Sequence, residues 1–452
     1  MISAEEFYTK RDARTAEWLD PTGLHAVSLG ISIDEVEAQT FAGQLAFLLL
    51  VNMSARWCQR ITLVAPDVPL HTALYCWGTN QLVDNALALA QRADPYGIFQ
   101  DQCEPVAASV RIHLGRHPTL PISCIRGRGW LSELRHSDDM KLKDDDSINP
   151  LGPALAACMG ASYMLRHALR HDDVCETAIL SLWNLHHGGA VIDGPDLQKS
   201  DIGRVLLIGA GAVGASIAYL LPLLNLNFSD LCIINPDQVD YSNLNRVPLF
   251  FIEHIGVPKS EVVHNYLCAA SVPSRYIGKW FNDVIGPELS LQNFDVVIPV
   301  ANEHGVRAAV QANYPPVMIH GSTGSQWDAY AGRHIPLVDD CLVCRFPQPA
   351  AAPRCAQGVL KEQESAGAAP LTGALPFLSL AAGVLALADL VKLVIPGDPP
   401  NANTTILSFK SANLRPMIFD RVPRANCGGC PDPVVWQKLN GSSRHAPSSG
   451  AG

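Results

Sequence analysis

Four cysteines stand in two closely spaced pairs, Cys341-Leu-Val-Cys344 and Cys427-Gly-Gly-Cys430. Four thiolates are the ligand set of a closed structural zinc site, which fastens separate parts of a chain together. The pairs are far apart in the sequence, so only a fold that brings them together can form one site. We predict a structural Zn²⁺ here, with two redox pairs or buried thiols as the alternatives.

Three glycines, Gly209, Gly211 and Gly214, form the pattern G-x-G-x-x-G between an apolar run and apolar residues at helical spacing. In such a strand-turn-helix unit, backbone N–H groups and the helix dipole can receive phosphates. Asp237, near the end of the next apolar run, could hold a ribose. The pattern alone does not distinguish NAD from ATP.

The segment NPDQVDYSNLNRVPLFFIEHIGVPK resembles the ubiquitin-activating superfamily of ThiF type, in which D-x-D-x-V precedes S-N-L-x-R and G-x-P-K. The matching residues are Ser242, Asn243, Leu244, Arg246, Gly256, Pro258 and Lys259. The resemblance implies an ATP- and Mg²⁺-dependent adenylation domain whose nucleotide site includes the three glycines, Asn235, Asp237 and Asn243. It places Arg246 and Lys259 against the triphosphate as pyrophosphate leaves. Either residue alone would by default be a surface charge in a loop.

The same resemblance extends to the cysteines. In the family, the two Cys-x-x-Cys pairs meet, one after the central sheet and one near the carboxyl end. Members that form a thioester carry a cysteine where Cys355 stands, typically followed shortly by Gly-Val, as Gly358-Val359 follow here. Cys355 is therefore the expected nucleophile, and Arg354 could favour its thiolate. The alternative is an inert buried thiol.

Two positions depart from the family pattern. Asn235 stands where an acid usually contacts the ATP ribose, and Asn302 stands where an acid usually holds magnesium, with Glu303 beside it. We expect either Glu303 or Asp237 to take over the metal, or magnesium binding to weaken. At the amino terminus, the resemblance makes Lys10 or Arg11 a candidate to lend a charge to the partner's ATP, although a solvated first helix is the alternative.

These residues require an α/β fold. The unit from Arg204 to Asp237 reads as strand, glycine turn, helix and strand, a βαβ crossover of a parallel sheet. Residues 25–67 repeat its outline without its motifs, and the helix from Asn149 with the strand ILSLWNL matches the helix from Leu375 with ILSFKSA. We predict a Rossmann-like adenylation domain at 201–439, preceded at 1–200 by a degenerate, inactive copy of the same fold. The polar stretch 194–203 serves as a linker, and 440–452 as a disordered tail.

Bulk composition narrows the class of protein. The chain has 452 residues, 48% of them hydrophobic, and a net charge of −10, so two domains are expected and neither nucleic acid nor an anionic membrane is favoured as a partner. Thirteen cysteines and a charged amino terminus are typical of a cytoplasmic protein with free or metal-bound thiols. The uncharged run Leu371–Ala388 is predicted to be a buried helix and not a membrane span.

Together these observations predict a ubiquitin-like protein activating enzyme. ATP and the C-terminal glycine of a ubiquitin-like protein would form an acyl adenylate, which Cys355 would convert to a thioester for a conjugating enzyme. The compact size resembles activating enzymes of bacterial ubiquitin-like conjugation. A sulfur-carrier or peptide adenylyltransferase is the first alternative, and a non-catalytic scaffold is the second. The copy at 1–200 would cover the face through which ThiF-type homodimers associate.

Overall fold

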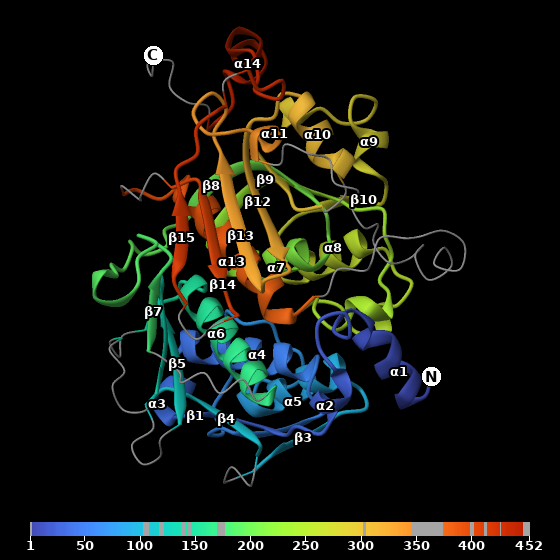
Figure 1. Cartoon of the computed structure of the whole chain (residues 1–452), viewed down its shortest axis with the longest axis vertical. Coiled ribbons are helices and arrows are strands. Elements are labelled where there is room, and N and C mark those ends of the chain that lie inside the picture. The colour runs from blue at the N-terminus through green and yellow to red at the C-terminus, as the bar shows by residue number, and fades with distance from the viewer. Residues whose placement is uncertain are drawn as a thin grey trace.

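The computed structural model of the chain describes residues 2–102, 108–116, 122–136, 142, 146–169, 177–301, 304–345, 374–397, 402–410, 414–424 and 426–445. The sites expected at Asn302, Glu303 and Cys355 lie outside these residues. Two β-sheets, one in the lower and one in the upper half of Figure 1, form the framework of the described chain.

The first half of the chain forms a seven-stranded sheet in the order β3-β2-β1-β4-β5-β6-β7. From β3 to β5 neighbours run parallel, whereas β6 and β7 are antiparallel additions. The strands are β1 (Leu29–Ile33), β2 (Arg60–Val64), β3 (Ile98–Asp101), β4 (Val110–Leu114), β5 (Ser123–Arg128), β6 (Leu131–His136) and β7 (Ala178–Ser181). The helices are α1 (Ala4–Arg11), α2 (Pro21–His25), α3 (Glu35–Ala38), α4 (Phe41–Ala55), α5 (Leu82–Ala93) and α6 (Leu151–Ala168).

The second half forms an eight-stranded sheet in the order β10-β9-β8-β11-β12-β13-β14-β15. Neighbours from β10 to β12 run parallel, and the last three strands are antiparallel. The strands are β8 (Ser200–Ile208), β9 (Leu226–Ile234), β10 (Arg275–Ile277), β11 (Val296–Pro299), β12 (Val317–Gly324), β13 (Asp328–His334), β14 (Thr404–Ser408) and β15 (Pro416–Phe419). The helices are α7 (Ala212–Leu220), α8 (Lys259–Ala269), α9 (Phe281–Val284), α10 (His304–Ala312), α11 (Leu342–Arg345), α13 (Pro376–Lys392) and α14 (Pro433–Asn440).

The two sheets have the same strand order and the same directions when β8 to β14 are matched in turn to β1 to β7. Three helix pairs, α4 and α7, α5 and α8, and α6 and α13, also lie at equivalent places in the two chain orders. The predicted α/β class and the repetition of one Rossmann-like fold are therefore confirmed. The sequence match of residues 149–185 to 375–412 covers α6 and β7 in the first half and α13 and β14 in the second.

Helices that are apolar on every side form the junction between the halves. Every residue of α4 is buried, and α13 is buried from Pro376 to Val391. Such helices belong inside a protein core. The helix α13 packs against both α6 and α7, and α4 packs against α6, which joins the halves into one hydrophobic core (Figure 1). Among the described residues, no helix has the length and apolar character that crossing a membrane would need.

The C-terminal stretch is described as far as His445. The indole of Trp436, on α14, is fully buried and donates to the carbonyl of Pro315 at 2.9 Å. Further on, Arg444 pairs with Asp201 at 2.7 Å. The first residues of the stretch that we expected to be disordered, 440–445, therefore lie against the second domain.

Candidate functional site

The glycine pattern forms the turn between β8 and α7, as the sequence predicted. Gly209 has φ +106°, and a Cβ there would lie 2.7 Å from the backbone nitrogen of Ala301. A Cβ on Gly214 would lie 1.9 Å from the carbonyl oxygen of Gly209, whereas one on Gly211 would meet nothing within 4 Å. Two of the glycines are therefore required for close packing, and the third borders open space. The amino end of α7 has no side-chain cap among the described residues, so its N–H groups are suited to an anion.

At the carboxyl end of β9, Asn235 presents an unused acceptor. The residue is only 6% exposed, and its backbone N–H and C=O are bonded to Ile277 and Ser260. Within the described part of the chain, its Oδ1 has no hydrogen-bond partner. A buried acceptor in that state costs about 1–3 kcal/mol. A ribose hydroxyl that donates to Asn235 would remove this cost, so the amide fits the ribose position although it carries no charge.

The hydroxyl of Ser242 is a second buried group of this kind. It is 6% exposed and its Oγ is likewise without a partner among the residues that the structure describes. Its backbone N–H donates to Asp240 at 2.8 Å, and Asn243 accepts from the Asp240 backbone at 3.0 Å. Asn243 therefore holds the single 3₁₀ turn Tyr241–Asn243 in shape, a structural contribution in addition to the predicted nucleotide contact.

Arg246 and Lys259 are both buried, at 7% and 3% exposure, which excludes a solvated surface charge. The Arg246 guanidinium donates to the carbonyl of Ser242 and to Asn245 Oδ1, the latter at 2.8 Å. Lys259, the first residue of α8, donates from Nζ to Asp237 Oδ2 at 2.9 Å. Asp237 is thus already paired with a cation, and a metal ion would have to share its carboxylate with Lys259.

The loop that carries Arg246 is held by the first domain, which the sequence did not predict. Arg56, which caps the carboxyl end of α4 and is 1% exposed, donates to the carbonyls of Leu244 at 2.7 Å, Pro248 at 3.0 Å and Phe250 at 3.2 Å. One guanidinium thus satisfies several buried acceptors of the other domain. The available signal was a lone arginine at the end of an otherwise apolar helix.

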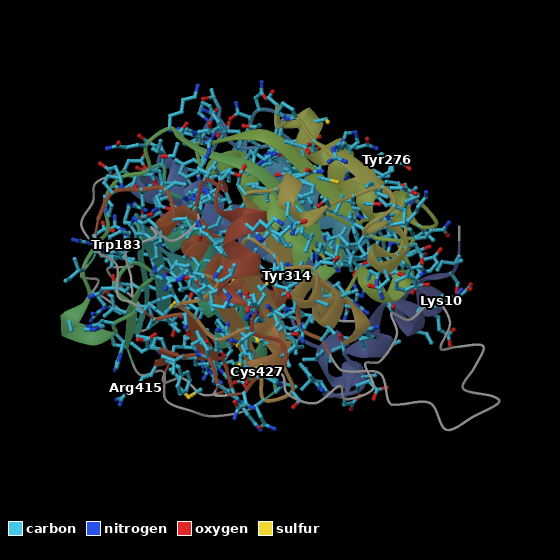
Figure 2. All side chains as sticks on the ribbon, turned by 90° about the horizontal axis from the view of Figure 1, so that it is seen from above. Lys10, Trp183, Tyr276, Tyr314, Arg415 and Cys427 are labelled. Atoms are coloured by element: carbon cyan, nitrogen blue, oxygen red, sulfur yellow. The ribbon has the colours of Figure 1, made fainter. Side chains whose placement is uncertain are left out.

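The amino-terminal candidates separate clearly. Arg11 is fully buried and pairs with Asp12 at 2.7 Å and Asp94 at 2.8 Å. Burial alone would raise the pKa of Asp12, but the Arg11 charge and the His25 hydrogen bond lower the pKa below its ordinary value. Lys10 is exposed, pairs with Glu6 at 2.7 Å and lies 5.2 Å from the ring centre of Tyr241. Of the two, only Lys10 has its side chain at the surface (Figure 2), beside Tyr241, which directly precedes the Ser242–Arg246 segment.

The four predicted zinc ligands come together. Their Sγ atoms all lie within 4.8 Å of one another, and the pairs Cys341–Cys427 and Cys344–Cys430 are each separated by 3.6 Å. In a tetrahedral Zn–S₄ site with bonds of about 2.3 Å, the sulfurs are about 3.8 Å apart. Backbone N–H groups point at the sulfurs of Cys341, Cys344 and Cys427 from 3.3 to 3.4 Å. The donor set therefore fits Zn²⁺.

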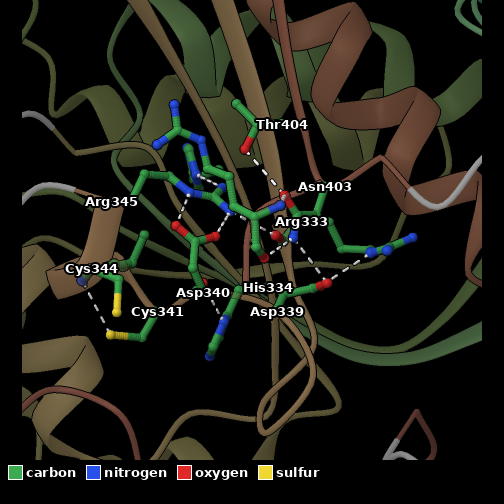
Figure 3. A network of polar contacts seen from close by, with 12 residues as sticks. Arg333, His334, Asp339, Asp340, Cys341, Cys344, Arg345, Asn403 and Thr404 are labelled. Atoms are coloured by element: carbon green, nitrogen blue, oxygen red, sulfur yellow. Dashed lines mark hydrogen bonds and ion pairs between the residues drawn. The ribbon is translucent and has the colours of Figure 1, made fainter. Parts of the chain in front are cut away.

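A network of buried polar side chains lies next to the first cysteine pair, Cys341 and Cys344 (Figure 3). Arg345, next to Cys344, pairs with Asp340 and contacts His320 Nε2 at 2.7 Å. The carbonyl of Asp340 contacts His334 Nδ1 at 2.8 Å. Burial lowers the pKa of His334 to about 4, so the ring is neutral and donates to that carbonyl at neutral pH. These contacts connect the segment that carries Cys341 and Cys344 to the end of β13.

Two protein-family models match the chain. The ThiF family model matches residues 188–431, and the model of the BilD N-terminal domain matches residues 28–181. The chain is 40% identical over 84 residues to a NEDD8-activating enzyme E1 catalytic subunit of Arabidopsis thaliana, covering 17% of this chain and 18% of that protein. It is 28% identical over 162 residues to a ubiquitin-activating enzyme E1-like protein of Saccharomyces cerevisiae, covering 34% and 24%.

A further relative is a sulfur carrier protein adenylyltransferase of Thermus thermophilus, 25% identical over 266 residues, covering 54% of this chain and 89% of that one. The chain spans less than a quarter of the length of the plant and yeast relatives. Among solved structures, Escherichia coli MccB with ATP matches 68% of this chain and 98% of its own at 14% identity, with a TM-score of 0.39.

Proposed function

Because the chain belongs to the ThiF family, we propose that its second domain uses ATP to adenylate the C-terminal glycine of a ubiquitin-like protein. The observation that carries the proposal is the set of buried polar side chains along the connection from β9 to the start of α8. Asn235 and Ser242 offer polar atoms without partners in the described structure, and Arg246 and Lys259 offer buried positive charge. A nucleotide would satisfy all of them.

Adenylation exchanges one bond for another at the α-phosphorus. A carboxylate oxygen of the carrier attacks that phosphorus, and the bond to the β-phosphate oxygen breaks to release pyrophosphate. Negative charge accumulates on the leaving group, so preorganised cations stabilise the transition state. We assign this role to Arg246 and Lys259. Lys259 can reach the phosphates only by leaving or sharing Asp237, which makes the 2.9 Å ion pair part of the reaction.

The same ion pair bears on magnesium. Mg²⁺ binds through carboxylates and substrate phosphates. The carboxylate of Asp237 is shared with Lys259, whereas Glu303 and Asn302 lie outside the described residues. We propose Glu303 as the carboxylate that holds the metal beside ATP, since the amide of Asn302 brings no charge to a hard cation.

We propose thioester formation as the second step. Cys355 loses its thiol proton to solvent, the thiolate attacks the acyl carbonyl of the adenylate, and the bond between the acyl carbon and the AMP oxygen breaks to release AMP. A conjugating enzyme then receives the acyl group. Cys355 lies outside the described residues, so this step rests on its position in the sequence.

A bound Zn²⁺ is the proposed occupant of the four cysteines. Metal at this position would join the cysteine pair at α11 to the Cys427–Cys430 segment, which leads into α14. It would thereby clamp the chain terminus onto the domain. The role is structural, because a site with four protein ligands leaves no open position for a substrate.

For the first domain we propose the role of a built-in partner. It supplies Arg56 and the α1 segment to the loop around Arg246. We propose that these contacts replace those of the second subunit of a ThiF-type homodimer. We therefore expect no symmetric dimer through the face that the first domain covers.

Two alternative functions differ from adenylation followed by thioester formation in the products that they would yield. A sulfur-carrier adenylyltransferase, which the Thermus relative favours, or a peptide adenylyltransferase would catalyse exchange but form no transferable protein thioester. A scaffold, suggested by Asn235 and Asn302, would do neither. In the test, Cys355→Ala is compared with Cys268→Ser, an exposed cysteine on α8. Cys355→Ala should keep adenylate formation and lose the thiol-reducible conjugate with the carrier. A conjugate that survives Cys355→Ala assigns the nucleophile to another cysteine.

A further inference from the structure

The first sheet retains the place where a nucleotide would bind. Its connection from β1 to α4, which contains the short helix α3, corresponds to the turn from β8 to α7, because the two sheets share the same strand order. The match holds at single residues. Gly43 is the third residue of α4 and Gly214 is the third residue of α7. A Cβ would lie 2.1 Å from the Glu37 carbonyl oxygen at Gly43, and 1.9 Å from the Gly209 carbonyl oxygen at Gly214.

The helix ends at these two places differ in what meets their N–H groups. The amino end of α7 has no side-chain cap among the described residues. At α4, the Thr40 hydroxyl accepts from Gly43 N at 2.9 Å, and Asp146 Oδ2 accepts from Phe41 N at 3.4 Å. The helix end that would face a phosphate in the first domain is therefore already bonded to the protein's own oxygens.

A carboxylate also fills the space in front of that helix end. Glu37, on α3, is 2% exposed, and its Oε2 would lie 3.0 Å from a Cβ at Gly43. Arg128 donates to both Glu37 oxygens at 2.8 Å, and Arg126 Nε donates to Oε1. Both arginines are 3% exposed and extend from β5. An anion between two guanidiniums at a helix amino end is the arrangement that binds phosphate.

The short helix α3 is held in place so that Glu37 can reach this position. Asp34 caps α3 by accepting from Glu37 N at 2.7 Å and also accepts from Arg116 N at 2.8 Å. Gly115, with φ +100°, permits this approach, because a Cβ there would lie 2.0 Å from Asp34 Oδ2. Contacts outside the Glu37–arginine cluster therefore also hold α3 and Glu37 in this position.

We infer that the first domain has filled its former nucleotide site from within: Glu37 takes the place of a nucleotide phosphate between Arg126, Arg128 and the first turn of α4. The domain consequently binds no ATP, and the chain holds one nucleotide at most. This inference deepens the proposed role of residues 1–200 as a partner domain. It also predicts that removing the carboxylate opens a latent site for an inorganic anion.

The test counts bound pyrophosphate by titration calorimetry in chloride buffer of constant ionic strength. Glu37→Ala should bind one more pyrophosphate per chain than the wild type. Glu37→Gln, which removes the charge but keeps the size, should also bind one more, with lower affinity than Glu37→Ala. Glu35→Ala, an exposed residue of the same helix, should match the wild type. The difference is expected whether the second domain binds one pyrophosphate or none, so it is separate from the proposed adenylation.

Thermal unfolding provides a second readout. Pyrophosphate should raise the unfolding midpoint of Glu37→Ala by several degrees more than that of the wild type. If Glu37→Ala is insoluble, Glu37→Gln carries the comparison. No extra pyrophosphate in either variant would overturn the inference, as would two ATP molecules bound per wild-type chain.

Discussion

Replacing one zinc ligand should detach metal and weaken the second domain. In Cys427→Ser the hydroxyl is a poor ligand for Zn²⁺, so the remaining three sulfurs should not retain the metal. The cluster closes the chain between Cys344 and Cys427, a loop that also contains β14 and β15. For a cross-link over about 80 residues, the lost chain entropy of the unfolded state corresponds to about 4–5 kcal/mol.

Other contacts reduce this loss. The β14–β15 ladder and the buried Trp436 hold the same segment without metal. We therefore expect a decrease in the free energy of unfolding of about 2–4 kcal/mol, below the full entropic value. For a domain of this size, that decrease lowers the unfolding midpoint by about 5–15 °C.

The assay combines metal analysis of the purified protein with thermal unfolding. Wild type and Cys268→Ser should contain one zinc per chain and unfold together, whereas Cys427→Ser should lack zinc and unfold earlier. Native wild-type protein without zinc, or equal midpoints for Cys427→Ser and Cys268→Ser, would exclude a stabilising zinc site at the four cysteines.

Three other predictions concern magnesium, the domain junction and acid stability. Glu303→Gln should raise the magnesium concentration that pyrophosphate exchange requires, whereas Asn302→Asp should lower it or leave it unchanged; exchange indifferent to Glu303 would exclude that ligand. Arg56→Met should lower the free energy of unfolding, because each buried carbonyl left without a donor costs about 1–3 kcal/mol. It should also slow exchange, because the loop that carries Arg246 loses its support, and the increase in the activation free energy of exchange should be at least as large as the loss in the free energy of unfolding. Asp12→Asn should lower the free energy of unfolding by about 3 kcal/mol at pH 7 in denaturant titrations. Since the pKa of Asp12 is depressed in the folded state, its stabilisation is present above the unfolded pKa, and the difference between wild type and variant should shrink as the pH falls below about 4.

The elements with strong local patterns were predictable from the sequence. An apolar strand, a glycine turn and a helix leave few alternatives, so the β8–α7 unit and the buried helix α13 could be predicted directly. The repeated order of helix and strand also indicated a second copy of the fold. The meeting of the cysteine pairs followed from the family resemblance, since spacing alone does not bring distant segments together.

Contacts between distant polar residues were not predictable. Glu37 lies on α3 whereas Arg126 and Arg128 lie on β5, far apart in the sequence, and nothing local indicates that they share one buried site. Likewise Asp237 read as a ribose or metal ligand, because its pairing with Lys259 depends on the fold of the β9–α8 connection. Local patterns specify elements, whereas the partner of a buried charge is set by tertiary packing.

Pyrophosphate exchange into ATP, measured with ubiquitin-like proteins as carriers, is the decisive measurement for adenylation by the second domain. Wild-type protein should catalyse exchange only with a carrier that has a free C-terminal glycine carboxylate. Lys259→Met should abolish the exchange, while Lys279→Met, which removes an exposed lysine paired with Glu288, should leave it intact. Exchange that needs no carrier carboxylate, or that persists in Lys259→Met, would contradict the account.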